Sequence, residues 1–321
     1  MALRGTFDGT RRGMTSMGVT TARLKWGFIW LIGRSRGGRN FPISPDDVFI
    51  VSYPRSGNTW TRFLIANLIY PQGAITFANI ERKIPDVYKN TRRQLLQTPR
   101  PRILKSHEYF DPRYKKVIYI VRDPRDVALS YYHFDRKRKK FEDGYPLELY
   151  ISRFIAGEVD DYGSWKENVA SWLATRQGAD SFLLLRYEDM LEQTAHELAK
   201  VASFLGIKRS PEQVARAVEL SSAERMRHLE KKEAGIWVNT KKTRREIPFV
   251  RTASSGGWRS LLPEDLVAVI ESAWGPLMES LAYDLVTAAR RPSRLACQGA
   301  WEPHRETTTP LIASPESKEN L

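Results

Sequence analysis

The sequence predicts an α/β fold of three layers, in which helices cover both faces of a central parallel sheet. Short runs of apolar, β-branched residues alternate along the chain with longer segments of helical periodicity. The first run, at 48–53, leads through a tight loop into a helical pattern. Strands that alternate with helices in this way are typical of parallel sheets, because a parallel connection needs a crossover.

The remaining elements follow in alternation. Strand-like runs lie at 48–53, 103–104, 116–121 and 181–186. Helical patterns cover 59–69, 124–135, 146–156, 164–176, 188–205, 211–220 and 263–283. Proline is tolerated near a helix start and occurs there at Pro124, Pro146, Pro211 and Pro263. Gly206 is expected to end the helix at 188–205.

Composition divides the chain into one domain and two ends. Residues 1–45 are rich in Arg, Gly, Thr and Ser, and residues 288–321 are rich in Pro, Thr, Glu and Ser. Such compositions cannot bury enough apolar surface to fold. We therefore expect a flexible N-terminal segment at 1–45, a catalytic domain at 46–287 and a disordered tail at 288–321.

Three features bear on the cellular compartment. Cys297 is the single cysteine, which excludes an intrachain disulfide and fits a reducing, cytoplasmic location. The apolar run at 26–32 is far shorter than the roughly 20 residues that span a bilayer. Residues 1–25 lack the apolar centre of a secretory leader. We expect a cytoplasmic protein without a membrane span.

The formal net charge of +14 predicts an anionic partner. Nucleic acid, an acidic membrane surface and a phosphorylated ligand all satisfy this charge, which alone does not choose between them. The basic run at 136–140 suits a nucleic-acid or targeting patch, but a solvated rim that attracts anions is the simpler interpretation.

The loop after the first strand has the features of a phosphate site. It lies between a buried strand and a helix start, so its backbone amides can point at an anion. Gly57 permits a close turn and Arg55 supplies a cation. Further donors are expected from Ser56, Asn58, Thr59 and Trp60. The Gly-x-x-x-x-Gly-Lys-Ser/Thr motif of ATP-hydrolysing proteins is absent, so a phosphate is bound without that motif.

This loop resembles the 5′-phosphosulfate signature of the sulfotransferase family, Tyr-Pro-Lys-Ser-Gly-Thr-Thr-Trp, which binds 3′-phosphoadenylyl sulfate (PAPS). Arg55 stands in place of its Lys and Asn58 in place of its first Thr. The stretch at 117–132 is similar to the family's 3′-phosphate signature. Its Arg122 ends a strand and its Ser130 lies two turns into the next helix, so both can reach one phosphate.

Between these signatures, Leu104-Lys105-Ser106-His107 resembles the family's Lys-Thr-His. The resemblance implies that His107 takes a proton from the acceptor as general base, while Lys105 and Arg55 stabilise charge on the transferring group. If His107 is not the general base, Glu108 is the next candidate for that role.

Weaker similarities complete the family's order along the chain. Arg186 to Met190 resembles its Tyr-Glu-Asp-Met, which implies that Tyr187 touches the adenine, and Ser221 starts a segment bordering the base. The last signature, at 249–259, keeps Arg251, whereas Thr252 replaces a Lys and Ala253 replaces a Gly. These three residues are implied to meet the 3′-phosphate.

The resemblance implies a P-loop-like sulfotransferase fold and transfer of a sulfuryl group from PAPS to a hydroxyl or amine, with no metal required. The acceptor is expected to be a small molecule or a glycan rather than nucleic acid, and a homodimer stays an open alternative. Two rival functions are a nucleotide or small-molecule kinase of similar fold and a basic nucleic-acid-binding protein.

Overall fold

The central sheet of the computed structural model, which describes residues 37–287, contains four parallel strands in that range. They are β1 (Val48–Ser52), β2 (Ile103–Ser106), β3 (Lys116–Val121) and β4 (Phe182–Arg186). Their order is β2-β1-β3-β4, and Ile50 lies between Lys105 and Ile118 on the neighbouring strands. The predicted parallel sheet is confirmed.

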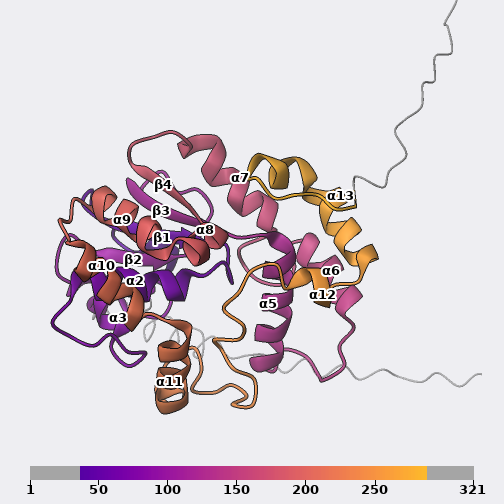
Figure 1. The fold of residues 1–321 in the computed structure, drawn as a ribbon, viewed down its shortest axis with the longest axis horizontal. Helices are drawn as coiled ribbons and strands as arrows, with labels where there is room; N and C mark the ends of the chain where they lie inside the picture. Colours follow the sequence, from indigo (N-terminus) through magenta and orange to yellow (C-terminus); the bar gives the residue numbers. More distant parts are fainter. Residues whose placement is uncertain (1–36, 288–321) are drawn as a thin grey trace, which may run out of the picture.

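Alternate residues of β1 enter two separate hydrophobic cores, one on each face of the sheet. Val48 and Ile50 face the first core, whereas Phe49 and Val51 face the second. The first core is closed mainly by α2 (Asn58–Ile69), α9 (Thr194–Leu205) and α10 (Pro211–Leu220). The second is closed by α5 (Pro124–Lys137), α6 (Leu147–Ile155), α7 (Trp165–Arg176) and α13 (Glu264–Ser280). Figure 1 shows α5, α6 and α13 gathered to one side of the strands. The three predicted layers are confirmed.

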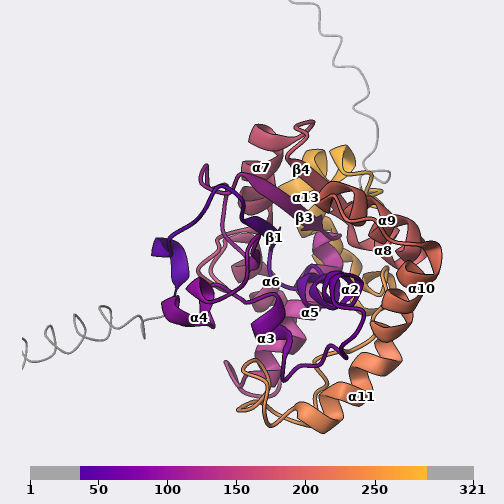
Figure 2. The ribbon, with the colours of Figure 1, turned by 90° about the vertical axis from the view of Figure 1, so that its left-hand side faces the viewer.

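Several helices differ from the expectation. The predicted helix at 188–205 is two helices, α8 (Tyr187–Glu192) and α9, because Gln193 leaves the helical region with φ −129° and ψ 50°. α11 (Ala223–Glu233) continues along one edge of the molecule beyond α10 (Figure 2). Unpredicted short helices are η1 (Gly38–Asn40), α3 (Ile80–Lys83), α4 (Arg92–Leu96) and α12 (Trp258–Leu261).

Residues 37–45, which composition assigns to the flexible N-terminal segment, pack onto the domain instead. The ring of Phe41 is buried, and the Arg102 guanidinium lies over it. Arg102 also forms a buried ion pair with Asp47. Because of these contacts, the packed part of the chain begins before residue 46. The expectations for 1–36, 26–32, 288–321 and Cys297 lie outside the described residues. Within 37–287, no helix is long and apolar enough to cross a membrane.

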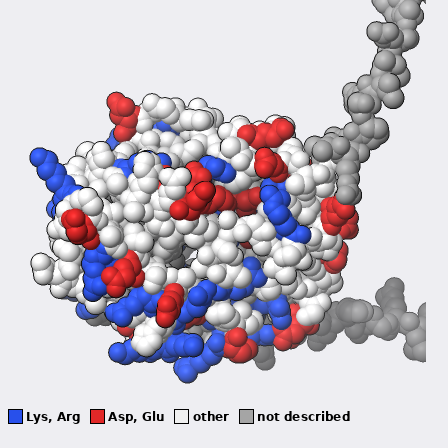
Figure 3. Space-filling view, viewed as in Figure 1, with Lys and Arg blue, Asp and Glu red and all other residues white. Residues whose placement is uncertain are grey.

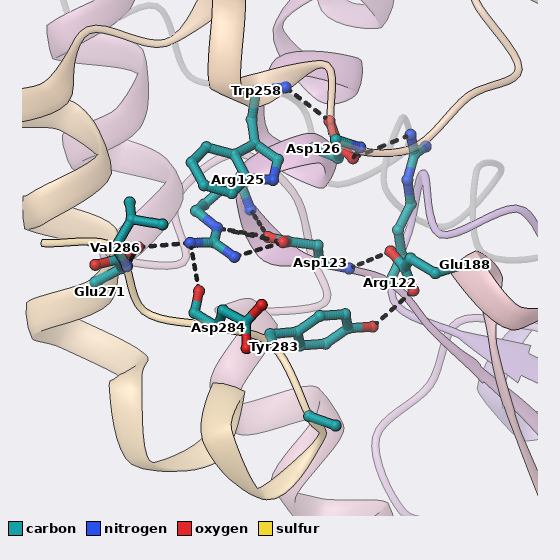
Figure 4. Close-up of polar contacts among 12 residues, drawn as sticks. Arg122, Asp123, Arg125, Asp126, Glu188, Trp258, Glu271, Tyr283, Asp284 and Val286 are labelled. Atoms are coloured by element: carbon teal, nitrogen blue, oxygen red, sulfur yellow. Dashed lines mark hydrogen bonds and ion pairs between the residues drawn. The ribbon is translucent and has the colours of Figure 1, made fainter. Parts of the chain in front are cut away.

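A buried charge network joins the end of β3 to α13, the last helix within residues 37–287 (Figure 4). Arg125 binds Asp123 at 2.7 Å and Glu271 of α13 at 2.5 Å, and its side chain is 1% exposed. The guanidinium also lies over the Trp258 ring, 3.7 Å from its centroid. Because Arg122 directly precedes Asp123, the network fixes the backbone from which Arg122 projects.

We expect Arg125→Ala to lower the free energy of unfolding by about 3–5 kcal/mol, because it leaves two buried carboxylates without their cation. Chemical denaturation measures this change. Arg216→Ala is the matched control, since the Arg216–Glu219 pair is exposed, and it should cost much less. Equal losses in the two variants would contradict the importance of the buried network.

Candidate active site

A cavity of about 1170 Å³ opens at the carboxyl ends of the strands. The β1–α2 loop, the ends of β2 and β3, the start of α8 and the segment before α12 all contribute to its wall. Of the predicted site residues, those that line it are Arg55, Gly57, Asn58, Thr59, Trp60, Lys105, His107, Arg122, Ser130, Tyr187, Ser221, Arg251, Thr252 and Ala253. Ser56 does not line it. Ligands of open α/β sheets bind at this edge.

The β1–α2 loop turns sharply at Gly57, whose φ of 99° is left-handed. A Cβ atom there would lie 2.5 Å from the Tyr187 ring, so a side chain at this position has no room. α2 begins directly after this glycine, and its free N-terminal amides favour an anion in the cavity.

Two loop side chains turn toward the protein. Asn58 donates from its Nδ2 to the Ile50 carbonyl at 3.3 Å and to the Ser52 hydroxyl at 3.2 Å. The amide therefore ties the loop to β1, whereas Thr59 remains partly exposed in the cavity. Ser56 is fully buried, and its hydroxyl has no hydrogen-bond partner among residues 37–287.

Arg55 connects the first and second signatures. Its Nε donates to the Ser130 hydroxyl at 3.2 Å. Its guanidinium lies 4.3 Å from the centroid of the Phe134 ring and 4.9 Å from that of Phe249. Burial and the charge of Arg122 lower the pKa of Arg55. Its backbone takes a φ of 70°, which is uncommon for a residue other than glycine.

Three arginines converge with little neutralising charge. Arg122 donates to the carbonyl oxygens of Arg55 at 3.3 Å and Ser254 at 3.0 Å, and the Asp126 carboxylate is 4.0 Å away (Figure 4). Burial, and then the charge of Arg122, lower the pKa of Arg251. The Nε of Arg122 is buried without a partner among the described residues. An anion with several negative oxygens would satisfy this arrangement.

Aromatic rings form the wall beside these arginines. The Trp60 and Tyr187 rings meet edge to face at 5.8 Å, and Arg122 lies over the Tyr187 ring. The Trp60 indole donates to the Ser221 carbonyl at 3.0 Å. The Ser221 hydroxyl accepts from Asn67 at 3.0 Å and is fully buried. Such a slot suits a flat aromatic base.

The segment with the last signature is fastened from two sides. Arg227 of α11 donates to the carbonyls of Arg251 and Thr252, both at 3.0 Å. The Asp126 carboxylate accepts from the backbone N–H groups of Gly256 and Trp258. Ala253 lies between these anchors with a φ of 53°, a left-handed conformation that strains a residue with a Cβ.

Lys105 is held by an ion pair that the sequence did not indicate. Its Nζ lies 2.7 Å from Asp86, and both side chains are buried. Burial lowers the pKa of Lys105, and the Asp86 carboxylate opposes that change. The charge of Lys105 in turn holds the pKa of Asp86 below its usual range, although burial acts the other way.

His107 has one ring nitrogen fixed and the other available. Its Nδ1 lies 2.7 Å from the Ser52 carbonyl oxygen, which can only accept, so Nδ1 carries the proton. Burial, and then the charge of Lys105, lower the pKa of His107 well below its usual range. The imidazole is therefore neutral near pH 7, and Nε2 is an unprotonated acceptor in the cavity wall.

Other residues of the wall were missed. Asp86, Tyr88 and Tyr162 line the cavity, and the Tyr162 ring meets the His107 ring edge to face at 5.4 Å. They lie in irregular segments without a local motif. Glu108, the fallback base, is absent from the wall and binds Arg39 at 2.8 Å.

Comparison with known proteins decides the family. Residues 45–282 match the sulfotransferase domain. The chain belongs to the sulfotransferase domain family. It is a PAPS-dependent sulfotransferase, and this membership decides against the kinase and nucleic-acid-binding alternatives.

Curated sulfotransferases resemble the chain along most of their length. Sulfotransferase 1B1 of Canis lupus familiaris is 30% identical over 237 residues, which cover 68% of this chain and 79% of that protein. Sulfotransferase 1A1 of Rattus norvegicus is 32% identical over 246 residues, which cover 69% and 81%.

Solved sulfotransferase structures share the fold. A retinol dehydratase in complex with androsterone and the inactive cofactor PAP has a TM-score of 0.64 at 23% identity, with 77% of this chain and 84% of that chain covered. A mouse sulfotransferase complexed with PAP has a TM-score of 0.62 at 24% identity, with 74% and 86% covered.

Because the pKa of His107 is lowered in the folded protein, the free energy of unfolding should depend on pH. Below about pH 6.5 the unfolded imidazole binds a proton that the folded protein does not, so His107 should cost up to about 1.4 kcal/mol of unfolding free energy per pH unit. We expect the stability of the native protein to fall relative to His107→Asn as the pH drops from 7 to 5.5. Denaturation curves of both proteins at each pH measure the difference. A difference independent of pH would contradict a neutral His107.

Proposed function

We propose that this sulfotransferase uses His107 as the general base in sulfuryl transfer from PAPS to a hydroxyl or amine of a small molecule or glycan. The observation that carries this proposal is the contact between Nδ1 and the Ser52 carbonyl. It fixes the tautomer in which Nε2 can accept a proton, and burial keeps the imidazole uncharged. The single cysteine supports a cytoplasmic location.

The donor is proposed to bind across the three arginines. The loop and α2 start, at Arg55, Ser56, Gly57, Asn58, Thr59 and Trp60, hold its 5′ end, and the 3′-phosphate meets Arg122, Ser130 and Arg251. Thr252 and Ala253 offer backbone groups beside that phosphate, and Tyr187 and Ser221 border the base. The buried Nε of Arg122, which has no partner among the described residues and belongs to a residue of the cavity wall, supports an anionic ligand at this place.

PAPS supplies the sulfuryl group. The acceptor heteroatom forms a bond to sulfur as the bond from sulfur to the 5′-phosphate oxygen breaks, and His107 Nε2 takes the acceptor's proton. Lys105 and Arg55 stabilise negative charge on the sulfuryl and leaving oxygens. Asp86 keeps the Lys105 ammonium at the end of β2, so the lysine acts there as part of an ion pair.

We expect His107→Gln to lower kcat by roughly a hundredfold to ten-thousandfold, because proton removal is lost, while PAP affinity stays near that of the native protein. Activity assays and calorimetry on one preparation measure both quantities. Glu108→Gln is the control, since Glu108 lies outside the cavity wall. A folded His107→Gln protein with most of its activity would remove the general-base role.

We expect Arg122→Ala to weaken PAP binding by about 1.5–3 kcal/mol, because a charged hydrogen bond to the 3′-phosphate is lost. Adenosine 5′-phosphate, which has no 3′-phosphate, should bind the native and variant proteins alike. Calorimetry with both nucleotides measures this. Equal weakening for the two ligands would place the 3′-phosphate elsewhere.

A further inference from the structure

The acceptor side of the cavity is formed by three loops, at 76–100, 136–162 and 231–250. Each loop contributes to the wall one exposed cation that has no acidic partner within residues 37–287, and these are Lys89, Arg138 and Lys242. None of the three forms an ion pair with a residue in the part of the chain that the structure describes. Lys89 follows Tyr88, in the same loop as the Asp86 that holds Lys105.

The other charges that these loops place in the wall are already satisfied, with one exception. Lys140 binds Asp135 and the Val159 carbonyl, and Asp160 accepts from Tyr131 and from the Tyr162 backbone. Asp86 is paired with Lys105 and Glu158 lies 3.7 Å from Arg153. Within 37–287, Asp161 is the one acid of these loops in the wall whose carboxylate has neither an ion-pair nor a hydrogen-bond partner. Three uncompensated cations face one uncompensated acid, so the acceptor side is electropositive.

The basic run at 136–140 contains members with acidic partners and members without them. Lys137 is 2% exposed and donates to the carbonyls of Arg244 and Ile247 at 2.9 and 2.5 Å, with Glu230 at 3.5 Å. It therefore fastens the 231–250 loop that carries Lys242. Arg136 pairs with Asp143 and Lys140 with Asp135, which leaves Arg138 and Lys139 without acidic partners among the described residues.

Cations continue outward from the cavity. A second hollow of about 550 Å³ shares Thr243 with the cavity wall and is lined by Lys139, Arg244 and Arg245 together with Glu142 and Glu246. Figure 3 shows Lys and Arg side chains gathered along this side of the molecule, over α11 and the neighbouring loops. Lys and Arg side chains thus extend from the acceptor side of the cavity to the exterior, with acidic side chains among them.

We propose that the acceptor is itself an anion, a hydroxyl or amine compound that also carries a carboxylate, phosphate or sulfate. This inference rests on the proposed function, because it assumes that the acceptor enters beside His107. Lys89, Arg138 and Lys242 bind the anionic group while the neutral heteroatom meets Nε2 of His107. The donor's phosphates meet a different set of cations, Arg55, Arg122 and Arg251, which lie in the donor-binding signatures.

The test uses two matched acceptors, 2-naphthol and 6-hydroxy-2-naphthoate, which differ by one carboxylate. We expect the carboxylate compound to have a KM at least roughly tenfold lower at low salt, and the advantage to shrink as salt is raised. If neither compound is sulfated, the proposed function fails; if both are sulfated with equal KM, only the anionic acceptor fails.

Substitution locates the binding groups. Lys89→Gln, Arg138→Gln and Lys242→Gln should each raise the KM for the carboxylate acceptor by roughly threefold, whereas the values for the uncharged naphthol and for PAPS should not change. Lys231→Gln and Lys232→Gln remove exposed cations of α11 that lie outside the cavity wall, and they are the matched controls. If the control substitutions raise the KM for the carboxylate acceptor equally, the effect is due to general surface charge and the proposal is overturned.

The same chemistry can come from a small acid or from an acidic glycan, and Lys139 separates them. A uronic-acid oligosaccharide is long enough to reach the second hollow, so Lys139→Gln should raise its KM if the glycan is the better acceptor. If the oligosaccharide is a poor acceptor and the naphthoate a good one, the proposal holds for small acids. If neither anion is preferred over the uncharged naphthol, the proposal is wrong.

Discussion

Mutual repulsion of three guanidinium groups, one buried and two half-buried, is the constraint around which the cavity is organised. Arg55, Arg122 and Arg251 come from the β1–α2 loop, the end of β3 and the segment before α12. Burial and the charge of Arg122 lower the pKa of Arg55 and of Arg251. Repulsion in a partly dehydrated cavity would separate mobile side chains. Carbonyl acceptors, aromatic rings and the Asp126 carboxylate hold them instead. The cavity is therefore prepared for a polyanion before one arrives, which lowers the cost of ordering it on binding.

The fold that delivers these groups was largely predictable, because its local patterns agree with its topology. The β-branched runs at 48–52 and 116–121 form the two central strands, and the parallel arrangement brings the carboxyl ends of the strands to one edge. The break at Gln193 was not predictable from periodicity, since the apolar spacing of 188–205 continues across it. The packing of residues 37–45 was not predictable, because Phe41 and Ile43 are isolated apolar residues in a polar context and Phe41 contacts Arg102, which is distant in the sequence.

Within the site, residues next to strand ends were predictable and their side-chain partners were not. His107 and Arg122 could be found because each directly follows the last residue of a strand. Asn58 turns back to β1, and Lys105 pairs with Asp86, which lies in an irregular segment between α3 and α4. The way in which the loops fold over the sheet determines these side-chain partners. No spacing in the sequence indicates that folding. The same holds for Tyr162 beside His107.

Buried Lys137 has a consequence for how the basic run should be studied. The usual test of a run of five basic residues is to replace all five together and to ask whether targeting or nucleic-acid binding is lost. Here such a replacement would also remove the Lys137 ammonium, which donates to the backbone carbonyls of Arg244 and Ile247 and lies 3.5 Å from Glu230. A phenotype from the block would mix a lost surface charge with a displaced wall of the active site. Trafficking experiments on this chain should retain Lys137 and vary its exposed neighbours alone.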